Sequence, residues 1–326
     1  MVYIKSLDKN IFPNYLKPYN DELLSSWLCR LSINHNVKPQ SFFLNFFGQD
    51  AAIWNRDIDL YIPRNILEIL SNHTPLSFEY ISSLLLTTYE GYLYENGNNK
   101  LGNKRNVLKI GIQHRQRRLF GLLYCPICLK KNGYYKKSWR LSTSILCITC
   151  NTLLHDKCYK CGCPIMFYRN YMGINNSTLI PIPMSCCGSC KFNLIHSPRI
   201  APTEAEMNYQ IYIDQTIMNG YNDFCSYSFE YISVLFILMH NLITNSKKNK
   251  FKIAAIKILG NLHMFEQKWI YLNDIERRQK ILPVIHFILH EKPDLLEEIL
   301  NKGGVYKSYF AEGWRLPYWF INKFNL

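Results

Sequence analysis

The cysteines of this chain fall into paired C-x-x-C units, and this feature most constrains its fold. Ten of the twelve cysteines lie between Cys125 and Cys190. The first unit has two C-x-x-C pairs that 18 residues separate: Cys125, Cys128, Cys147 and Cys150. Two such pairs can place four thiolates tetrahedrally, about 2.3 Å from one ion, and the spacing is typical of a zinc ribbon. The sequence therefore predicts a structural zinc ion here.

A second unit repeats the same paired spacing. Its predicted ligands lie in two pairs that 25 residues separate: Cys158, Cys161, Cys187 and Cys190. The ligand set stays open, because neighbouring cysteines and histidines could substitute: Cys163, Cys186, His155 and His196. We prefer the C-x-x-C pairs, since both repeat the turn of the first unit, and we predict a second structural zinc ion.

The ligand types argue against catalysis. A catalytic zinc keeps one coordination position open for water and usually has histidine or carboxylate ligands. Here the preferred ligands are all cysteines, and no acidic residue lies between Glu95 and Asp156 to act as a base. The chain also lacks the P-loop, G-x-S-x-G and H-E-x-x-H motifs. We therefore expect a non-enzymatic protein, with a zinc hydrolase acting on nucleic acid as the weaker alternative.

The net charge of +14 is concentrated in the middle of the chain. Residues 96–203 carry 17 Lys and Arg against one acid, Asp156, whereas the two flanks together sum to −2. Two four-thiolate zinc sites reduce the central charge from +16 to about +12. A basic surface of this size suits a nucleic acid, although it could also serve solubility alone. The candidate contacts are basic residues before the first cysteine unit: Lys104, Arg105, Lys109, Arg115, Arg117 and Arg118.

Apolar periodicity predicts a mainly α fold with small zinc-ribbon β elements. We expect four parts: an N-terminal helix-turn-helix domain (residues 1–95), a basic linker (96–121), a module of two tandem four-cysteine zinc ribbons (122–196) and a C-terminal helical domain (197–326). The first helix of the helix-turn-helix should be capped by Asn20 and the second should run from Pro39 to Gly48. The alternative is a small helical domain without a nucleic-acid role.

Shorter patterns complete the organisation. Further helices are expected near residues 63–71, 77–89, 232–243, 253–265 and 281–289. Trp139 and Leu141 should cover the first zinc site from a strand, and Cys29 and Cys225 should be buried as small hydrophobic residues. We find no secretory signal and no apolar run long enough to cross a bilayer. These absences predict a cytoplasmic protein without membrane contact, whose cysteines bind metal and do not form disulfides.

Two motifs stand out beyond the cysteine spacing. Residues 18–31, PYNDELLSSWLCRL, look like a P-x-x-x-E-S-L-x-S-W-x-x-R-x-A signature with Leu23 in place of the first serine. Residues 124–162 follow the order C-P-x-C, Y, W-R, C-x-x-H, L, C-x-x-C-G, with Cys150 where histidine is common. Together these motifs resemble the TniQ family of transposon target-selection proteins, which includes TnsD. The resemblance covers about residues 15–195.

The resemblance implies a protein that selects the insertion site of a transposon without cutting DNA. Such proteins recruit a TnsC-like AAA+ ATPase, which brings the transposase. CRISPR-associated members dock on a guide-RNA effector complex such as Cascade, in some systems as a homodimer, whereas TnsD-like members bind a fixed target DNA site. The moderate length of the chain, without a long DNA-binding extension, favours the CRISPR-associated role.

The runner-up is a sequence-specific DNA-binding protein that reads its site with the helices between Trp27 and Phe47. Trp27 and Arg30, on the signature helix, are our candidate partner contacts. The alternative, which we favour slightly for these two residues, is a core tryptophan and a salt-bridged surface arginine.

Overall fold

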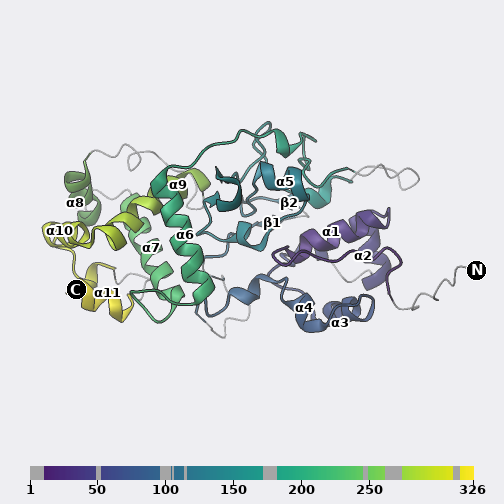
Figure 1. Ribbon diagram of the computed structural model, residues 1–326, viewed down its shortest axis with the longest axis horizontal. Helices are drawn as coiled ribbons and strands as arrows, with labels where there is room; N and C mark the ends of the chain where they lie inside the picture. Colours follow the sequence, from purple (N-terminus) through teal and green to yellow (C-terminus); the bar gives the residue numbers. More distant parts are fainter. Residues whose placement is uncertain are drawn as a thin grey trace, which may run out of the picture. The chain divides into compact units, whose positions relative to one another are not determined.

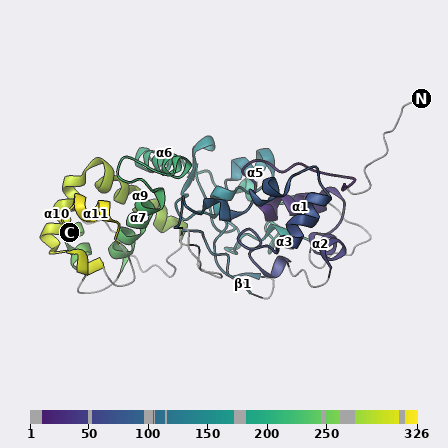
Figure 2. The same cartoon turned by 90° about the horizontal axis from the view of Figure 1, so that it is seen from below.

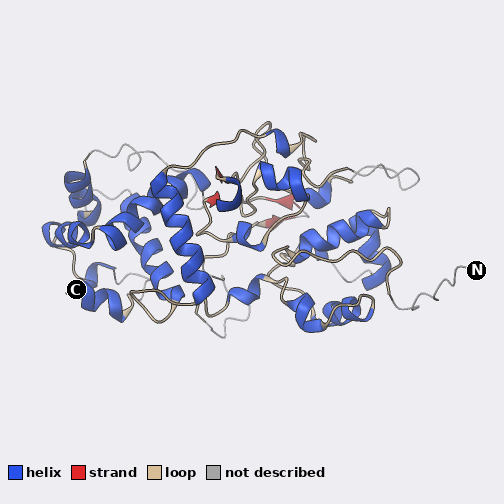
Figure 3. Cartoon of the chain, viewed as in Figure 1, coloured by secondary structure: helices blue, strands red, loops and turns tan. Residues whose placement is uncertain are grey.

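The computed structural model describes residues 11–48, 53–95, 104, 106–113, 116–171, 182–244, 249–260, 274–310 and 316–326. The described chain is mainly helical with two short two-stranded sheets (Figures 1 and 3), which confirms the predicted fold class. It forms two compact units. Unit 1 comprises Met1–Thr88, Val107–Leu141 and Leu154–Arg199, and unit 2 comprises Tyr89–Asn106, Ser142–Leu153 and Ile200–Leu326. The four predicted domain boundaries stay a prediction.

Unit 1 begins with helices α1 (Leu24–Asn34) and α2 (Pro39–Phe47). The predicted apolar face of the first helix is confirmed, because all its members are fully buried: Leu23, Leu24, Trp27, Leu28 and Leu31. The second helix has Pro39 in its first turn and ends at Gly48, where φ is 81°. These two signals acted as the sequence predicted.

The predicted cap at Asn20 is wrong. Helix α1 starts only at Leu24, and its N-cap, Leu23, makes no side-chain cap. The reason is a tertiary contact: the backbone of Glu22 pairs with Lys136, and the Leu23 N–H donates to the Tyr135 carbonyl at 2.9 Å. This pairing holds Glu22 and Leu23 out of the helical conformation, so the helix begins about one turn later than its local sequence suggests.

The remaining elements of unit 1 are short. They are the 3₁₀ turn Ile53–Asn55, α3 (Arg64–Asn72), α4 (Phe78–Ser82), the antiparallel strands β1 (Ile112–Gln113) and β2 (Gln116–Arg117), α5 (Pro126–Asn132), and the 3₁₀ turns Lys137–Arg140, Phe167–Arg169 and Leu194–His196. The helix predicted over 77–89 is interrupted after Ser82, and a 3₁₀ turn, Leu86–Tyr89, follows. The Leu86 N–H donates to the Asp59 carbonyl at 2.7 Å, so it leaves the helical hydrogen-bond pattern. Trp139 lies in the 3₁₀ turn and not on a strand, which corrects that expectation.

Unit 2 has a small hairpin and a helical bundle. Strand β3 (Leu146–Cys147) pairs with β4 (Thr152–Leu153), and the 3₁₀ turn Ile148–Cys150 connects them. The helices are α6 (Glu204–Asn219), α7 (Ser228–Ile243), α8 (Lys250–Leu259), α9 (Ile275–His286) with a π-helical continuation (Phe287–Glu291), α10 (Pro293–Gly303), the 3₁₀ turn Lys307–Phe310, and α11 (Tyr318–Lys323). Helices α6, α7 and α9 pack together (Figures 1 and 2). The apolar segments 232–243 and 281–289 lie in this packing, and 253–265 lies partly in α8 and partly outside the described residues.

Buried polar side chains fix the segment before the hairpin. Arg278 of α9 donates to the carbonyls of Ser142 and Ser144 at 2.8 and 3.0 Å. Gln210 of α6 accepts from the Ile145 N–H at 2.7 Å. The helices therefore determine where the strand carrying Cys147 starts.

The two isolated cysteines differ. Cys29 is fully buried, as predicted. Cys225 is only partly buried and donates to Asn222 Oδ1 and the Tyr227 carbonyl, so it is a polar turn residue and not the buried hydrophobic residue expected. Among the described residues, no helix combines the length and apolar character needed to cross a membrane.

Candidate metal centres

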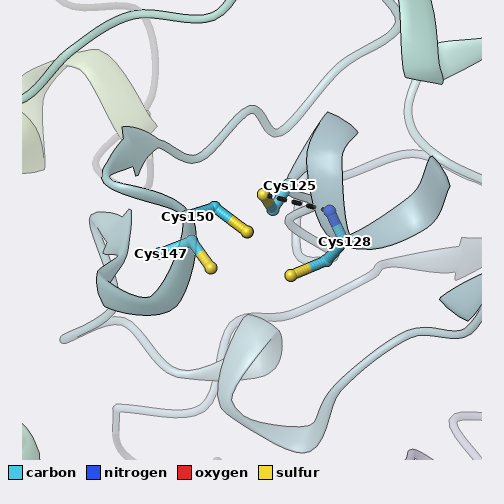
Figure 4. A group of neighbouring side chains, drawn as sticks. All are labelled: Cys125, Cys128, Cys147 and Cys150. Atoms are coloured by element: carbon cyan, nitrogen blue, oxygen red, sulfur yellow. Dashed lines mark hydrogen bonds between the residues drawn. The ribbon is translucent and has the colours of Figure 1, made fainter. Parts of the chain in front are cut away.

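The first cysteine unit converges on one point (Figure 4). Cys125 is the N-cap of α5 and Cys128 lies in its first turn, whereas Cys147 ends β3 and Cys150 ends the following 3₁₀ turn. Their four Sγ atoms all lie within 4.8 Å of one another. The Cys128 N–H donates to Cys125 Sγ at 3.5 Å, a contact that favours a thiolate. The arrangement can hold one metal ion.

The distances between the sulfurs of the second unit can be compared with those expected around one tetrahedral metal ion. Its Sγ atoms also lie within 4.8 Å of one another, and both the Cys158–Cys190 and the Cys161–Cys187 pair are 3.7 Å apart. Four sulfurs at 2.3 Å from one ion stand about 3.8 Å apart at the corners of a regular tetrahedron. A disulfide needs about 2.05 Å. The spacing therefore fits one tetrahedral ion and does not fit a disulfide.

The chain closes three of the four C-x-x-C turns in the same way. A residue with positive φ follows the second cysteine in each: Asn151 (48°), Gly162 (68°) and Lys191 (61°). In the second unit, the N–H of this residue donates to the carbonyl of the first cysteine, at 2.8 Å for Gly162 and 3.0 Å for Lys191. This left-handed residue turns the chain back after the second sulfur, so both sulfurs of a pair face the same side.

The alternative ligands do not join either group of sulfurs among the described residues. His155 Nε2 lies 2.8 Å from the Pro198 carbonyl and its ring stacks on Tyr124, while burial lowers its pKa. His196 instead lies in a 3₁₀ turn beside Phe192. Cys163 follows the Cys158–Cys161 pair and Cys186 precedes the Cys187–Cys190 pair, and neither belongs to the group of sulfurs. The structure brings together the C-x-x-C set that we preferred.

The pKa values of the thiols in the second site shift in opposite directions. At Cys190 desolvation opposes the thiolate, but the Phe192 N–H and the thiols of Cys161 and Cys158 lower its pKa to about 7. At Cys161 the pKa is raised, first by desolvation. A metal ion binding all four sulfurs must therefore release protons, and its binding strengthens with pH.

The signature residues are used in packing. Trp27 is fully buried, and its indole N–H donates to the Leu16 carbonyl at 2.7 Å. Arg30 pairs with the buried Glu22 and lies 4.5 Å from the Tyr19 ring centroid. Ser26 also donates to Glu22, and burial raises the pKa of Glu22 to about 7 against the opposing effect of Arg30. The structure therefore places Trp27 in the core and Arg30 in a salt bridge, which is the alternative described for these two residues.

The basic candidates separate into three groups. Lys109 and Arg118 are exposed. Lys104 pairs with Glu90 at 3.4 Å and lies over the Tyr94 ring. Arg117 is buried, where it donates to the Ile165 carbonyl at 2.9 Å and its guanidinium contacts the Phe167 and Tyr168 rings, so a partner cannot reach it in this structure. Arg105 and Arg115 lie outside the described residues.

Sequence reasoning missed a buried ion cluster around Arg140. This fully buried guanidinium donates to Asp57, to Asp59 at 3.3 Å and to the Leu108 carbonyl at 2.9 Å. Asp59 also accepts from the N–H and the hydroxyl of Ser25, both at 2.8 Å. The cluster joins α1, the 57–59 loop and the segment after α5. The tryptophan–arginine motif marked Arg140, but nothing local to the sequence indicated its partners.

Helix α2 presents an apolar surface. Leu44, Asn45 and Phe46 are exposed, and the helix contains no charged residue. Phe42 and Phe43 face the core. The exposed face of the predicted second helix of the helix-turn-helix is therefore suited to apolar contact.

The comparison with known families agrees with the motifs. The sequence model of the TniQ family matches residues 13–154, which include the signature, the Arg140 cluster and the first cysteine unit. No curated protein matches the chain. Residues 13–154 are thus a TniQ domain, which indicates a transposition-associated protein.

Proposed function

We propose that this protein is a non-enzymatic target-selection adaptor. It links a target-bound, guide-RNA effector complex of the Cascade type to a TnsC-like AAA+ ATPase. The competing function is direct reading of a DNA site by the two N-terminal helices, as in TnsD-like proteins.

The observation that carries this choice is the chemistry of the helix pair. A helix that reads the major groove needs donors and acceptors for base edges and basic residues for phosphates. Helix α1 has its apolar face and Trp27 in the core, and α2 exposes Leu44 and Phe46 without a single Lys or Arg. An apolar, uncharged surface of this kind favours contact with a protein. The candidate helix-turn-helix is better suited to docking a protein than to reading a groove.

We infer that both cysteine groups hold structural zinc. Zinc bound by four thiolates supplies folding energy, and it leaves no coordination position for a water nucleophile. The eight cysteines would hold the turns of the zinc-ribbon module in place and perform no chemistry. Thiols kept available for metal also suit a reducing compartment such as the cytoplasm.

The exposed basic residues support a secondary role for nucleic acid. Lys109 and Arg118 lie on the surface, and the only acid of residues 96–203, Asp156, is buried. Such a surface gives weak, sequence-independent and salt-sensitive binding. It fits an adaptor that works beside a guide RNA or target DNA.

Two measurements test the adaptor against the reader. Fluorescence anisotropy with random and candidate-site duplexes should show micromolar, sequence-independent binding that weakens steeply with salt. A pull-down with a TnsC-like AAA+ ATPase and a Cascade-type effector complex should recover at least one of them. Nanomolar binding to one duplex, together with no recovery of either protein, would establish the DNA reader.

A charge substitution on α2 localises the docking. Phe46→Glu should abolish recovery of the protein partner and leave duplex binding unchanged. Tyr61→Glu is the matched control, because Tyr61 is another exposed aromatic residue of unit 1 outside α2. Light scattering of both variants separates loss of a homodimer from loss of a different partner.

A further inference from the structure

Three of the exposed tyrosines of unit 2 come from separate segments of the chain. Tyr92, Tyr221 and Tyr227 have 44%, 59% and 56% of their surface exposed. Tyr92 lies in the described segment 53–95, three residues before its end at Glu95. Tyr221 lies just after α6, and Tyr227 is the N-cap of α7. Single exposed aromatic residues are common on protein surfaces, but a contiguous group marks an interaction site.

Backbone contacts show that these three segments meet. The Ser228 N–H donates to the Gly220 carbonyl at 2.7 Å, and the Ser228 hydroxyl donates to the Tyr92 carbonyl at 2.6 Å. A Cβ atom at Gly220 would lie 3.2 Å from the Tyr92 ring, so this ring lies against the glycine backbone. Tyr221 directly follows Gly220 and Tyr227 directly precedes Ser228. We call Tyr92, Tyr221 and Tyr227 the tyrosine patch.

The surroundings of the tyrosine patch are acidic, although the chain as a whole is strongly basic. Between Arg199 and Lys247 the sequence has five acidic residues and no Lys or Arg. Asp223 lies between Tyr221 and Tyr227 and is exposed. Glu230, one turn into α7, lies close enough to Glu95 for the two carboxylates to repel each other, and burial together with this repulsion raises the pKa of Glu230.

A cation already uses this type of surface within unit 2. The Lys323 ammonium of α11 lies 4.2 Å from the centroid of the Phe224 ring, next to Asp223. Lys104, in turn, pairs with Glu90 and lies 4.9 Å from the Tyr94 ring centroid. In both cases a lysine ammonium lies over an aromatic ring, and Lys104 is also paired with a carboxylate. At the tyrosine patch the same combination is exposed, because Tyr221 and Tyr227 lie on either side of the exposed Asp223 in the sequence.

We propose that the tyrosine patch binds an arginine-rich segment of a partner protein. Aromatic faces attract cations, and a planar guanidinium stacks on them better than an ammonium does. The carboxylates of Glu95, Asp223 and Glu230 supply the complementary charge. Nucleic acids and anionic lipid surfaces are repelled by the same carboxylates, so they do not fit this surface. The proposal stands whether the chain is an adaptor or a DNA reader.

Labelled peptides test the proposal on the full zinc-loaded chain. Octa-arginine should bind, and it should bind at least threefold more tightly than octa-lysine. Tyr221→Ala and Tyr227→Ala should each weaken octa-arginine binding at least fivefold, and Tyr227→Phe should retain it. Non-specific attraction cannot explain the expected binding, because a chain with a net charge of +14 would attract octa-glutamate and repel octa-arginine.

Tyr306→Ala is the matched control, since Tyr306 is an exposed tyrosine of the same unit with 69% of its surface exposed. It should leave octa-arginine binding unchanged. Circular dichroism and zinc content should be the same for all variants. Absence of octa-arginine binding, equal loss in Tyr306→Ala, or equal affinity for octa-lysine would each overturn the proposal.

Discussion

Replacing Arg140 by methionine should destabilise the TniQ domain by about 3–5 kcal/mol, the cost of removing one partner from a buried ion pair. The substitution keeps the unbranched apolar part of the side chain and removes the donors to Asp57, Asp59 and the Leu108 carbonyl. Asp59 is 1% exposed, so water cannot replace the lost guanidinium. Its carboxylate would keep only the two hydrogen bonds from Ser25.

The effect should depend on pH with a defined sign. Burial raises the pKa of Asp59, and Arg140 opposes that rise. Without Arg140 the folded-state pKa of Asp59 rises further above its unfolded value. Between the unfolded and the folded pKa of Asp59, the folded variant then binds more protons than the unfolded chain. The stability of the variant therefore falls as pH increases through this range. The deficit of Arg140→Met should therefore shrink as pH is lowered toward 5.

Hydrogen exchange of the α1 amides measures this loss, because Ser25 of that helix contacts the cluster. Adding Asp59→Asn to Arg140→Met should recover about 1–2 kcal/mol, since no buried charge is then left unpaired at residue 59. Arg64→Met is the matched control: its ion pair with Glu68 is exposed, so its loss should cost less than about 0.5 kcal/mol. A change below about 1 kcal/mol in Arg140→Met, or no recovery in the double variant, would refute the reasoning.

Three further predictions concern single residues. Cys187→Ser should lower the zinc content from two ions to one by elemental analysis, and iron in place of zinc would contradict the assignment. Thr203→Ala removes the capping box with Glu206 and should destabilise unit 2 by about 1 kcal/mol in urea unfolding; no change would show that the cap is dispensable. Burial, and then His290, lowers the pKa of His286 to about 4, so the unfolded state binds the extra proton. The contribution of His286 to the stability of unit 2 should fall by about 2 kcal/mol from pH 7 to pH 5, and His286→Gln should remove this part of the pH dependence; an unchanged pH dependence in this variant would contradict the reasoning.

The metal groups were predictable because their geometry is local. A C-x-x-C turn places two sulfurs on one side of the chain whatever surrounds it, and the pairs fall at a spacing that a ribbon allows. Even the choice among spare ligands followed from the repeated turn, and the structure brings that set together. The zinc ions themselves stay a prediction until the metal is measured.

The other features depend on residues far apart in the sequence. Arg140 meets Asp57 across 83 positions, and no periodicity connects them. The pairing of Glu22 with Lys136 moved the start of α1 away from Asn20. Arg117 lies in a run of basic residues that suggested an exposed surface. Its side chain is nevertheless buried, because it contacts the rings of Phe167 and Tyr168 and donates to the Ile165 carbonyl. In each case a tertiary contact overrode the local pattern.

The placement of the family motifs limits where partner choice can be encoded. Glu22, Trp27 and Arg140 are fully buried, and Arg30 is held by Glu22. A substitution at any of them acts on stability before it acts on a partner, so these residues define the domain and not its target. Specificity must then lie on exposed residues that the signature does not contain. The apolar face of α2 and the tyrosine patch both meet that condition, and their opposite chemistry, uncharged in one and acidic in the other, favours two different protein partners.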